Sequence, residues 1–303
     1  MNKLFRLILD RRFRFDVLCA RGFYNRWSDE RVIKKKFKLK FGYDLDLENP
    51  QTFNEKLQWL KLYDRKPEYS LMVDKYEAKK LAADKIGEEY LIPTLGVWES
   101  FDDIDFSKLP EKFVLKCTHD SGSIVICKNK AAFDVDAARK KLSKAMKRNY
   151  YYGEREWPYK SLKPRIIAEE FMVDGKTEEL RDYKFFCFNG EAKMLFIATG
   201  RQSGEEVKFD FFDMDFNHLP IKNGHPNATT PPEKPETFEQ MKEIAAKLSE
   251  GIPQVRVDLY EINGRIYFGE LTFAHFGGFV KIEPKEWDEK MGKWVLLPQN
   301  IKE

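Results

Sequence analysis

Residues 255–273 read VRVDLYEINGRIYFGELTF, two apolar-rich segments separated by Asn263-Gly264. An Asn-Gly pair between such segments predicts a tight β-hairpin. The hairpin brings Asp258 and Glu270 near each other on adjacent antiparallel strands. Carboxylates among apolar neighbours are costly unless a cation neutralises them, and Mg²⁺ binds through one or two carboxylates together with phosphate oxygens. The segment therefore indicates a Mg²⁺ site, and the alternative is an ion pair of Asp258 with Arg256 or another basic residue.

A second strand–loop–strand segment covers residues 113–127. Its first strand ends at Lys116, and a short loop of small and polar residues follows. Backbone N–H groups of such a turn, together with a lysine charge, can hold a phosphate group. A plain hairpin turn is the alternative, because the loop contains one glycine. The loop residues are His119, Asp120, Ser121, Gly122 and Ser123.

A third segment lies at the end of a buried strand predicted over residues 165–172. It reads Ala168-Glu169-Glu170-Phe171-Met172, two carboxylates followed by bulky apolar residues. A connector of this kind can receive a purine through its backbone groups. A solvated strand end is the ordinary alternative.

The rest of the chain contains both helical and strand-like segments. Thr52 followed by Glu55 predicts a capping box at a helix start, and Asn189-Gly190 predicts a further hairpin. Helices are expected over 28–70 with short breaks, 71–86, 134–149 and 237–250. Strands are expected over 113–116, 123–127, 165–172, 182–188, 191–198, 254–260 and 265–273, with a proline-rich loop over 226–235.

The composition limits the class of protein. A length of 303 residues with 42% hydrophobic content suits one large domain or two closely packed ones. Charged residues at 34% and aromatic residues at 15% indicate a globular chain with a strongly charged surface. The cysteines form no CxxC pair, so neither a disulfide framework nor a zinc site is indicated, and a reducing cytosol fits best. They are Cys19, Cys117, Cys127 and Cys187.

Positive charge is concentrated near the N-terminus. Residues 1–40 hold 13 Lys and Arg against 4 Asp and Glu, a net charge of +9, which leaves 40 against 46, or −6, for the remainder. Residues 1–22 have apolar side chains near helical spacing but no run long enough to span a bilayer, and they lack a signal-peptide pattern. Two interpretations remain, a helix docked on an anionic membrane surface or a surface helix packed on the domain. No nucleic acid partner is expected, because no recognised motif accompanies the basic residues.

Taken in order, these segments resemble the ATP-grasp superfamily. In that superfamily a first lysine and a second lysine before a flexible loop bind phosphates, a hinge holds adenine, and acidic residues on the last strands bind Mg²⁺. The corresponding segments are Val73-Asp74-Lys75-Tyr76, Phe113-Val114-Leu115-Lys116, Glu169-Glu170-Phe171-Met172, and Asp258 with Glu270.

A narrower resemblance, to the TupA-like ATP-grasp family, covers residues from about 45 to 280. It rests on TFNEKLQWLKLYDR, VDKY, YLIPTLGVW, FVLKCTHDSGS, REWPYKSLKPRIIAEEF, DYKFFCFNG and FGELTF. The resemblance implies an α+β ATP-grasp fold, with two α+β subdomains clasping ATP behind a helical N-terminal extension. The implied regions are 1–70, helical and basic; 71–168, with the phosphate-binding loop; and 169–303, with the hinge and the Mg²⁺-binding strands.

The same resemblance implies a role for each nucleotide-binding residue. Lys75 and Lys116 would bind the phosphates, and the loop from His119 to Ser123, including Ser121 and Gly122, would cover them. Glu169 would meet the adenine amino group, while backbone groups at Glu170 and Met172, with Phe171 between them, would meet the ring. Asp182 would contact the ribose, with Glu178 as the alternative.

The remaining implied roles concern the metal and the chemistry. Asp258 and Glu270 would bind Mg²⁺, and Thr272 stands where many ATP-grasp enzymes have Asn. Arg256 would stabilise an acyl phosphate, and Lys184 would reach phosphate or the acceptor. The chain also departs from the usual pattern at Asp120, a negative charge in the phosphate loop, and at Lys79-Lys80, where an Arg is usual.

The function implied is an ADP-forming carboxylate–amine ligase that uses ATP and Mg²⁺ and proceeds through an acyl phosphate. The TupA-like family is associated with capsular and cell-wall polysaccharide synthesis. The expected substrates are therefore a uronic acid or related carboxylate on a sugar precursor and an amino acid or other amine, in the cytoplasm or at the inner face of the membrane. The alternatives are a glycosyltransferase, a label this family often carries, a kinase-like enzyme, or a nucleotide-binding module without turnover.

Overall fold

The computed structural model describes residues 3–175, 180–200 and 206–299, whose named strands form two antiparallel sheets. The strands are β1 (Thr94–Trp98), β2 (Phe113–Cys117), β3 (Ile124–Cys127), β4 (Ile166–Glu170), β5 (Asp182–Phe188), β6 (Glu191–Thr199), β7 (Lys208–Asp213), β8 (His218–Leu219), β9 (Val255–Ile262) and β10 (Arg265–Thr272). The larger sheet has the order β10-β9-β5-β6-β7-β8 and the smaller one the order β1-β4-β2-β3. Strand β4 is the last strand of the smaller sheet along the chain, and the subdomain boundary predicted between residues 168 and 169 falls within it.

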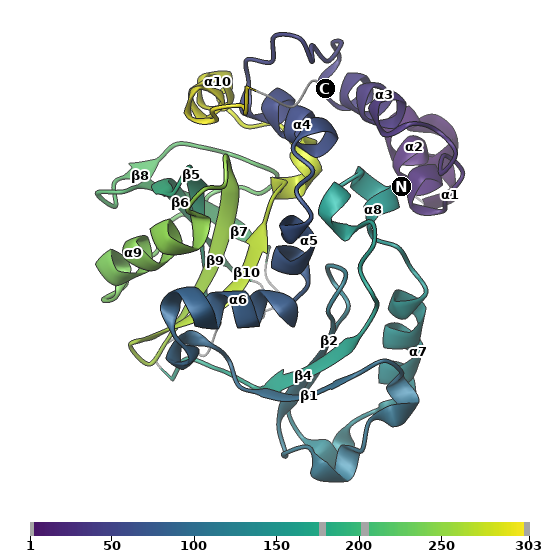
Figure 1. Ribbon diagram of the computed structural model, residues 1–303, viewed down its shortest axis with the longest axis vertical. Coiled ribbons are helices and arrows are strands. Elements are labelled where there is room, and N and C mark those ends of the chain that lie inside the picture. Colours follow the sequence, from purple (N-terminus) through teal and green to yellow (C-terminus); the bar gives the residue numbers. More distant parts are fainter. Residues whose placement is uncertain (1–2, 176–179, 201–205, 300–303) are drawn as a thin grey trace.

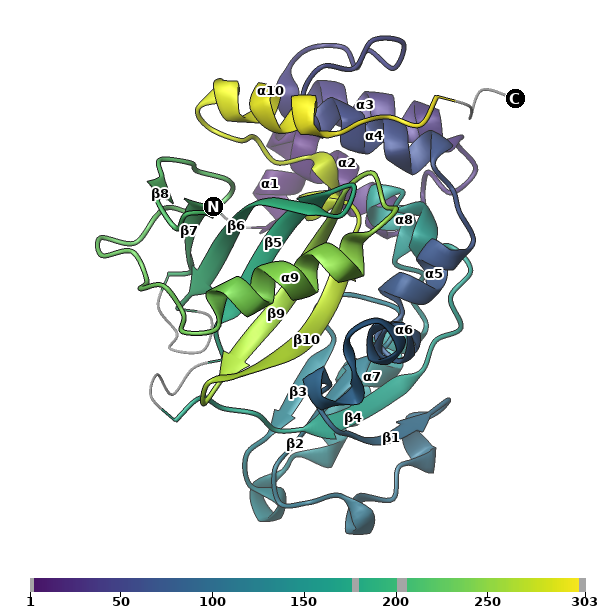
Figure 2. The ribbon, with the colours of Figure 1, turned by 60° about the vertical axis from the view of Figure 1, so that its left-hand side comes forward.

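The helices surround and separate the two sheets. They are α1 (Lys3–Leu9), α2 (Arg11–Ala20), α3 (Asp29–Phe41), α4 (Phe53–Tyr63), α5 (Glu68–Val73), α6 (Glu77–Ile86), α7 (Val135–Met146), α8 (Tyr151–Glu154), α9 (Phe238–Ser249) and α10 (Lys285–Trp294). Figure 1 shows the smaller sheet at the lower end of the molecule, the larger sheet at the upper left and α1 to α3 at the upper right. Figure 2 shows α9 lying across the larger sheet, with α6 above the smaller one.

Both predicted Asn-Gly hairpins are confirmed. Asn263 and Gly264 have φ values of 52° and 75°, and Asn189 and Gly190 have values of 48° and 83°. Positive φ at both central residues matches the right-handed twist of the flanking strands, and Asn and Gly adopt it most readily. The capping box of α4 is also present, because Thr52 and Glu55 each accept the other's backbone N–H.

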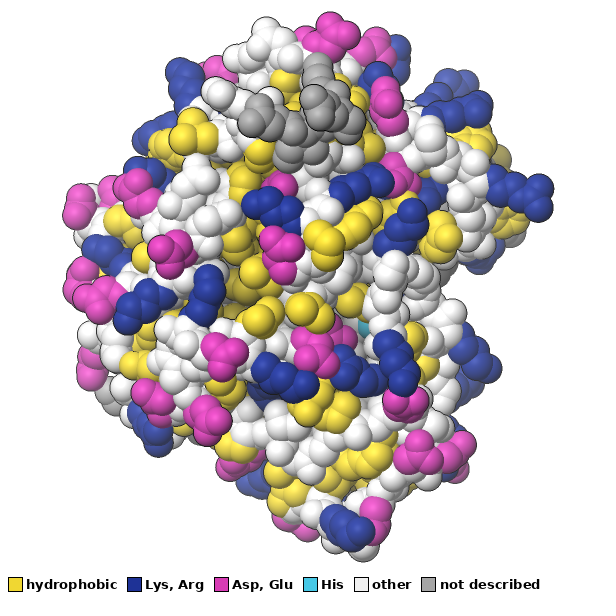
Figure 3. Space-filling view, in the orientation of Figure 1, with side chains coloured by type: hydrophobic (Ala, Val, Ile, Leu, Met, Phe, Trp, Pro, Cys, Tyr) yellow, Lys and Arg dark blue, Asp and Glu magenta, His cyan; other side chains and the backbone are white. Residues whose placement is uncertain are grey.

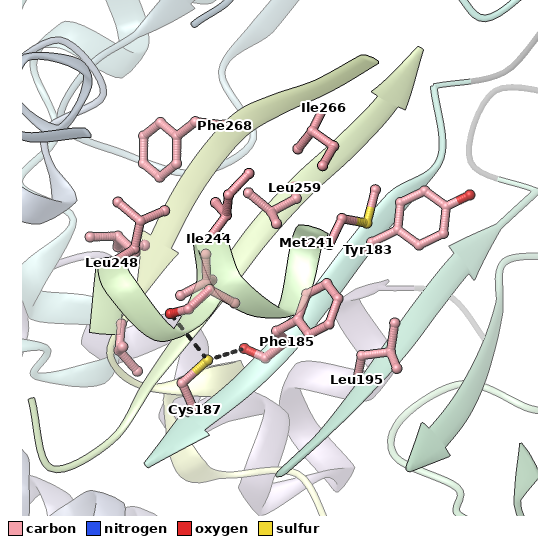
Figure 4. Close-up of a cluster of buried hydrophobic side chains, with 14 of the residues drawn as sticks. Tyr183, Phe185, Cys187, Leu195, Met241, Ile244, Leu248, Leu259, Ile266 and Phe268 are labelled. Atoms are coloured by element: carbon pink, nitrogen blue, oxygen red, sulfur yellow. Dashed lines mark hydrogen bonds between the residues drawn. The ribbon is translucent and has the colours of Figure 1, made fainter. Parts of the chain in front are cut away.

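The main core lies between α9 and one face of the larger sheet. Figure 4 shows Phe185, Leu259 and Phe268 of the strands gathered with Ile244 and Leu248 of α9. Because side chains alternate along a strand, the intervening residues of β5 and β9 point to the opposite face of this sheet. That opposite face carries the polar residues of the site described below.

The single helix predicted over residues 71–86 is in fact two helices, α5 and α6, separated at residues 74–76. The break has a local cause, since the Asp74 carboxylate accepts the backbone N–H groups of Tyr76 and Glu77 at 3.0 and 3.1 Å. Its other oxygen accepts the Thr118 hydroxyl at 2.7 Å. The interruption therefore fixes Lys75 against the loop that follows β2.

The predicted helical N-terminal region packs through only part of its apolar surface. Ile33 and Phe37 of α3 join a cluster with Trp59 of α4, and Phe15 of α2 is buried beside Val32. Apolar side chains of α1 remain exposed. Within the described ranges no helix has both the length and the apolar character needed to cross a bilayer.

Candidate functional site

The polar face of the larger sheet is assembled by strand register. Lys184 of β5 lies opposite Asp258 of β9, and Asp258 lies opposite Glu270 of β10. Simple counting from the turn would pair Asp258 with Gly269, but a bulge between Phe268 and Glu270 shifts the register by one residue. The bulge turns Glu270 onto the same face as Asp258, away from α9.

Glycine is required at this bulge. A Cβ on Gly269 would lie 2.9 Å from the carbonyl oxygen of Asp258 and 3.1 Å from the Tyr260 ring. Any side chain would therefore push β9 and β10 apart at the position where their carboxylates meet. Gly269 therefore allows the bulge that places Glu270 on the same face as Asp258.

Asp258 is enclosed by two basic side chains. Arg256 donates from Nε to Oδ1 at 2.6 Å and from Nη2 to Oδ2 at 2.8 Å, and Lys184 also donates to Oδ2. Burial alone would raise the pKa of this carboxyl, but the charges of Arg256 and Lys184 lower it to about 2. Asp258 is thus ionised and paired with Arg256, as one of the two sequence interpretations expected.

Glu270 and Thr272 form the open side of the same cluster. The Arg256 Nη2 lies 3.0 Å from the Thr272 hydroxyl and 3.4 Å from Glu270 Oε1. The Glu270 side chain is 41% exposed, whereas that of Asp258 is 1% exposed. The Arg256 guanidinium therefore contacts the accessible Glu270, the enclosed Asp258 and the Thr272 hydroxyl.

Carboxylate and hydroxyl oxygens are ligands that suit Mg²⁺, which usually keeps several waters and binds through one or two carboxylates plus substrate phosphates. Both Asp258 oxygens already accept hydrogen bonds from Arg256 and Lys184, so Glu270 is the carboxylate of this pair that is accessible to a metal. The described part of the chain contains no group of three or more His, Cys, Asp and Glu side chains that could hold a metal by themselves.

A histidine fixes the orientation of Arg256. The Arg256 Nη1 donates to His275 Nδ1 at 2.6 Å, so His275 carries its proton on Nε2 and donates it to Asn223 Oδ1 at 2.7 Å. Burial, reinforced by the Arg256 charge, lowers the pKa of His275 well below its ordinary value. The neutral ring is a fixed acceptor, and Asn223 was not identified from the sequence because it lies in a loop without a motif.

The two residues proposed for the ribose lie in different situations. Asp182 begins β5, and its Oδ1 lies 3.3 Å from Lys184 Nζ. Glu178 lies outside the described residues.

The loop after β2 is held in a defined shape by Lys75. The Lys75 backbone N–H donates to the Thr118 carbonyl at 3.1 Å, and its ammonium donates to the Asp120 carbonyl. The Asp120 carboxylate accepts the Ser123 hydroxyl and is buried, so its negative charge is turned into the loop. Gly122 has a φ of 90°, a left-handed conformation that favours glycine.

His119 anchors the loop on its other side. Its Nε2 lies 3.2 Å from the carbonyl oxygen of Ala145 in α7, and the side chain is buried. Ser121 and Gly122, by contrast, are exposed at the tip. The loop therefore presents its tip from a base fixed by Lys75 and His119.

Lys116 and Glu169 meet on neighbouring strands of the smaller sheet. Lys116 Nζ lies 2.5 Å from one Glu169 oxygen, and Lys79 of α6 pairs with the other oxygen. Burial would raise the pKa of Glu169, but these two lysines lower it to about 2. Lys79, at a position where the family usually has Arg, thus completes a buried ion cluster that sequence reasoning did not predict.

The hinge that follows β4 is packed on the larger sheet. The Glu170 N–H donates to the Pro93 carbonyl at 3.1 Å, so an adenine ring here would use other backbone groups of the segment. Met172 packs in a small cluster with Tyr267, and the Phe171 ring lies 5.9 Å from Lys128 Nζ. The predicted hinge residues therefore lie where the two sheets join.

A cavity of about 400 Å³ connects the loop with the polar face of the larger sheet. Ser121 of the loop lines it together with the sheet residues Lys184, Arg256, Glu270 and Thr272. Its remaining wall comes from α3, the segment around α8, one residue each of β6 and β7, and residues 274–280. Those wall residues include Lys36, Lys40, Tyr150, Glu154, Glu156 and Tyr159.

A second cavity, of about 630 Å³, lies on the other side of the loop tip. Asp120, Ser121, Gly122 and Ser123 form one wall of it. The opposite walls carry basic residues from α7 and from the end of α2, namely Arg21, Lys141, Lys144, Lys147 and Arg148. Ser121 lines both cavities, so the loop tip separates a mixed-charge cavity from a basic one.

Comparison with known protein families identifies the class of this fold. The sequence pattern of the family described as TupA-like ATP-grasp matches residues 55–296. The chain has an ATP-grasp fold and belongs to the TupA-like ATP-grasp family, which confirms the resemblance found in the sequence. A comparison with curated proteins gave no match.

Several solved structures are similar in outline. The D-alanine–D-alanine ligase of Bacillus anthracis complexed with ATP is 14% identical with a TM-score of 0.41, over 67% of this chain and 55% of that one. The D-alanine–D-alanine ligase of Helicobacter pylori is 15% identical with a TM-score of 0.41, over 82% and 68%. The ATP-grasp ligase PsnB complexed with a precursor variant, Mg and ADP is 11% identical with a TM-score of 0.43, over 91% and 73%. The chain spans just over half the length of the Bacillus anthracis ligase.

Proposed function

We propose that this protein is an ATP-dependent carboxylate–amine ligase that forms an amide through an acyl phosphate. The observation that supports this most directly is the cavity in which Ser121 of the loop faces Arg256, Glu270 and Thr272 of the larger sheet. Phosphoryl transfer to a carboxylate requires a phosphate-covering loop and fixed positive charge around one reacting centre. The cavity supplies both at one place.

In this proposal the nucleotide lies between the two sheets. The hinge residues Glu169 to Met172 receive the adenine, Asp182 contacts the ribose, and Lys75 and Lys116 bind phosphate oxygens. Asp258, Glu270 and Thr272 would hold Mg²⁺, which when bound offsets negative charge on the phosphates. The loop residues His119, Ser121, Gly122 and Ser123 cover the β- and γ-phosphates.

The chemistry has two steps. A carboxylate oxygen of the acceptor attacks the γ-phosphorus of ATP, and ADP leaves. The amine nitrogen then attacks the acyl carbon, inorganic phosphate leaves, and the nitrogen loses a proton. Arg256, fixed by Asp258 and His275, offsets charge on the acyl phosphate, and Lys184 supplies a second cation at the same wall.

The acceptor we propose is an acidic sugar, a uronic acid or related carboxylate of a cell-surface polysaccharide precursor. The reaction cavity supports an anionic acceptor, because Lys36, Lys40, Lys184 and Arg256 line it. Tyr150 and Tyr159 in the same cavity offer rings against which a sugar can pack. Membership in the TupA-like family supports the polysaccharide setting.

The proposed function predicts that ATP is consumed only when both substrates are present. Purified protein with Mg²⁺ and ATP is incubated with glucuronic acid, galacturonic acid or UDP-glucuronic acid and with a panel of amino acids. ADP and inorganic phosphate should appear together, and the product mass should equal that of the two substrates less one water. ADP without inorganic phosphate, with a phosphorylated sugar, would identify a kinase. Sugar transfer without ATP consumption would identify a glycosyltransferase, and bound ATP that is never consumed a binding module.

We also propose that the protein works in the cytoplasm at the inner face of the membrane, held there by its N-terminal helices. Four large apolar residues, Phe5, Ile8, Leu9 and Phe23, are 61% to 69% exposed in this region. Residues 3–26 hold seven Lys and Arg against two Asp. Figure 3 shows dark-blue and yellow side chains next to one another at the upper right of the molecule, where Figure 1 places α1 to α3. Exposed apolar groups surrounded by arginines suit an anionic lipid surface.

This membrane contact predicts selective binding to vesicles. The protein should sediment with vesicles that contain phosphatidylglycerol and stay in solution with pure phosphatidylcholine. The combined change Ile8→Ser and Leu9→Ser should weaken binding by at least about 100-fold, because two buried leucine-sized side chains are lost. Leu296→Ser, at an exposed leucine outside this surface, serves as the control. Equal binding to both vesicle types, or none to either at low salt, would contradict the proposal.

A further inference from the structure

Glu156 is a buried carboxylate with no partner in the wall of the reaction cavity. It is 5% exposed, and it lines the cavity together with Arg256 and Glu270. Its neighbour Glu154 is ion-paired, with Oε2 2.5 Å from Lys36 Nζ. The Glu156 backbone carbonyl accepts the Tyr159 N–H at 3.1 Å, but within the described ranges its carboxylate has neither a hydrogen bond nor an ion pair within 4 Å. A buried, unpaired carboxylate is costly, so this group needs an explanation beyond the fold.

The backbone around Glu156 is rigidly held. The Gly153 carbonyl accepts Lys36 at 3.2 Å, and the Glu154 carbonyl accepts Lys61 at 2.8 Å. Arg155 has a φ of 56° and is almost completely buried, with Nη2 bound to the Tyr24 carbonyl at 2.6 Å. A non-glycine residue in this left-handed region is strained, and such strain is maintained by surrounding contacts. The contacts of α3, α4 and the turn that follows α2 thus hold the backbone on the N-terminal side of Glu156 in place.

Charged side chains of α3, α4, α8 and β9 act on the Glu156 carboxyl. Burial raises its pKa, opposed by Lys61 of α4, reinforced by Glu154 and opposed again by Lys36 and Arg256. Lys61 gives its hydrogen bonds to the carbonyls of Glu154 and Gly277 and none to Glu156. The carboxylate therefore has a higher proton affinity than an exposed glutamate, which suits a general base near neutral pH.

The other carboxylates at this site already have partners or a proposed role. Asp258 is bound by Arg256 and Lys184, and Glu154 by Lys36. Glu270 is the open carboxylate proposed for Mg²⁺. Tyr150 and Tyr159 also line the cavity, but burial raises the pKa of each phenol, so neither is a base near neutral pH. Among the described residues of this wall, Glu156 is the acid group left for a further task.

We propose that Glu156 binds the amino group of the nucleophile and accepts its proton during amide formation. This role rests on the proposed ligase function. An amine enters as an ammonium ion without a free electron pair, and a carboxylate both attracts that cation and removes its proton. As the carbon–nitrogen bond forms, the bond from the acyl carbon to the phosphate oxygen breaks, and its electrons leave with inorganic phosphate. The nitrogen loses two protons in all: one moves to a Glu156 oxygen before the attack and passes on to solvent, and the other leaves with the departing phosphate after the carbon–nitrogen bond has formed.

Two small amines of equal size separate proton removal from the remaining chemistry. Methylamine is protonated near pH 7 and needs a base, whereas hydroxylamine is largely neutral and does not. The full-length protein is supplied with Mg²⁺, ATP and each carboxylate of the uronic acid panel, and the methylamide and the hydroxamate are measured for the wild type and for Glu156→Gln. Methylamide formation should fall at least about 100-fold in the variant, with hydroxamate formation unchanged. Glu156→Asp should restore part of the methylamide rate.

A control variant and three possible results test the proposed role of Glu156. Glu154→Gln is the matched control, because Glu154 lines the same cavity and has a partner; its effect on the two amines should be equal. If Glu156→Gln lowers both products alike together with the melting temperature, the residue is structural and the proposal is wrong. It is also wrong if neither product changes. If the wild type forms no hydroxamate from any carboxylate, the ligase function itself is wrong, and the role of Glu156 is lost with it.

Discussion

Replacement of Asp258 by Asn is expected to lower kcat by about 10³-fold and to destabilise the fold by about 3 kcal/mol. Both carboxylate oxygens accept hydrogen bonds from buried cations, two from Arg256 and one from Lys184. An amide keeps the size but removes the charge, which leaves the two buried cations with only their more distant carboxylates, Glu270 at 3.4 Å from Arg256 and Asp182 at 3.3 Å from Lys184. It also points an N–H₂ group at one of them. Arg256 is then no longer fixed at the cavity wall, so both the metal cluster and the acyl-phosphate contact are disturbed.

The control for this variant is Asp210→Asn. Asp210 is also fully buried in the larger sheet, in β7, where it accepts His218 Nε2 at 3.1 Å, but it does not line the reaction cavity. Its substitution should cost stability while turnover at low temperature is retained. The measurements are kcat with saturating substrates and urea unfolding of both variants. Full turnover by Asp258→Asn would remove the metal and phosphate assignments.

The lowered pKa of Asp258 also predicts how the free energy of unfolding falls in acid. Its pKa falls from an ordinary value of 3.8 to about 2 in the folded protein. A carboxyl whose pKa is lower in the folded state stabilises the fold fully above the unfolded value and loses this contribution as pH falls through the folded value. The wild type should therefore lose this contribution between about pH 4 and pH 2, and Asp258→Asn should lack that part of the pH dependence.

Local sequence signals predicted the hairpins, because their cause is local. The Asn263-Gly264 and Asn189-Gly190 pairs supply two consecutive positive φ values by themselves, so no distant contact is needed to recognise them. The pairing of β5 with β9 depends on residues 68 to 78 positions apart and carries no such signal. The bulge at Gly269 is intermediate: the glycine is visible in the sequence, but its need arises from the neighbouring strand.

The candidate site was predicted as a set of residues and not as a network. Sequence motifs named Arg256, Asp258, Glu270 and Thr272, which the fold brings around one guanidinium. The supporting groups come from elsewhere, such as Asn223 beneath His275. Such partners have ordinary spacing along the chain, and only packing in three dimensions makes them neighbours. The same holds for the part of the cavity wall that α3 supplies.

The basic residues of the N-terminal region lie in two different environments. The sequence predicts a helix docked on an anionic membrane or packed on the domain surface for residues 1–22, and it assigns no role to the basic residues of α3. In the structure, Lys36 is almost completely buried, ion-paired with Asp16 and Glu154, and lines the reaction cavity. Helix α3 thus supplies part of the cavity wall, while α1 keeps its apolar side chains exposed. Charge composition alone cannot separate these two situations, because both place lysine and arginine on amphipathic helices.

Lys79→Met is expected to lower mainly stability, and Lys116→Met is expected to lower mainly the use of ATP, although both lysines bind the same carboxylate. The Lys116 side chain is 20% exposed, and that of Lys79 is 8% exposed. Lys79 also donates to the Ile92 carbonyl at 2.7 Å and to the Thr94 hydroxyl at 3.0 Å, so it ties α6 to the smaller sheet. Its loss should lower the free energy of unfolding by about 3 kcal/mol, since buried acceptors and Glu169 lose their donor.

Among the described residues, the Lys116 side chain makes no hydrogen bonds like those of Lys79 to Ile92 and Thr94. Glu169 keeps Lys79 as a counter-ion when Lys116 is removed. Its replacement should therefore leave unfolding nearly unchanged and lower kcat/KM for ATP by about 100-fold, because a fixed cation next to the phosphates is lost. ATP titrations and urea unfolding of both variants test this division. The opposite pattern, with Lys116→Met unstable and Lys79→Met impaired only in ATP use, would move the phosphate contact from β2 to α6. The ATP phosphates would then have to lie nearer the hinge than the loop.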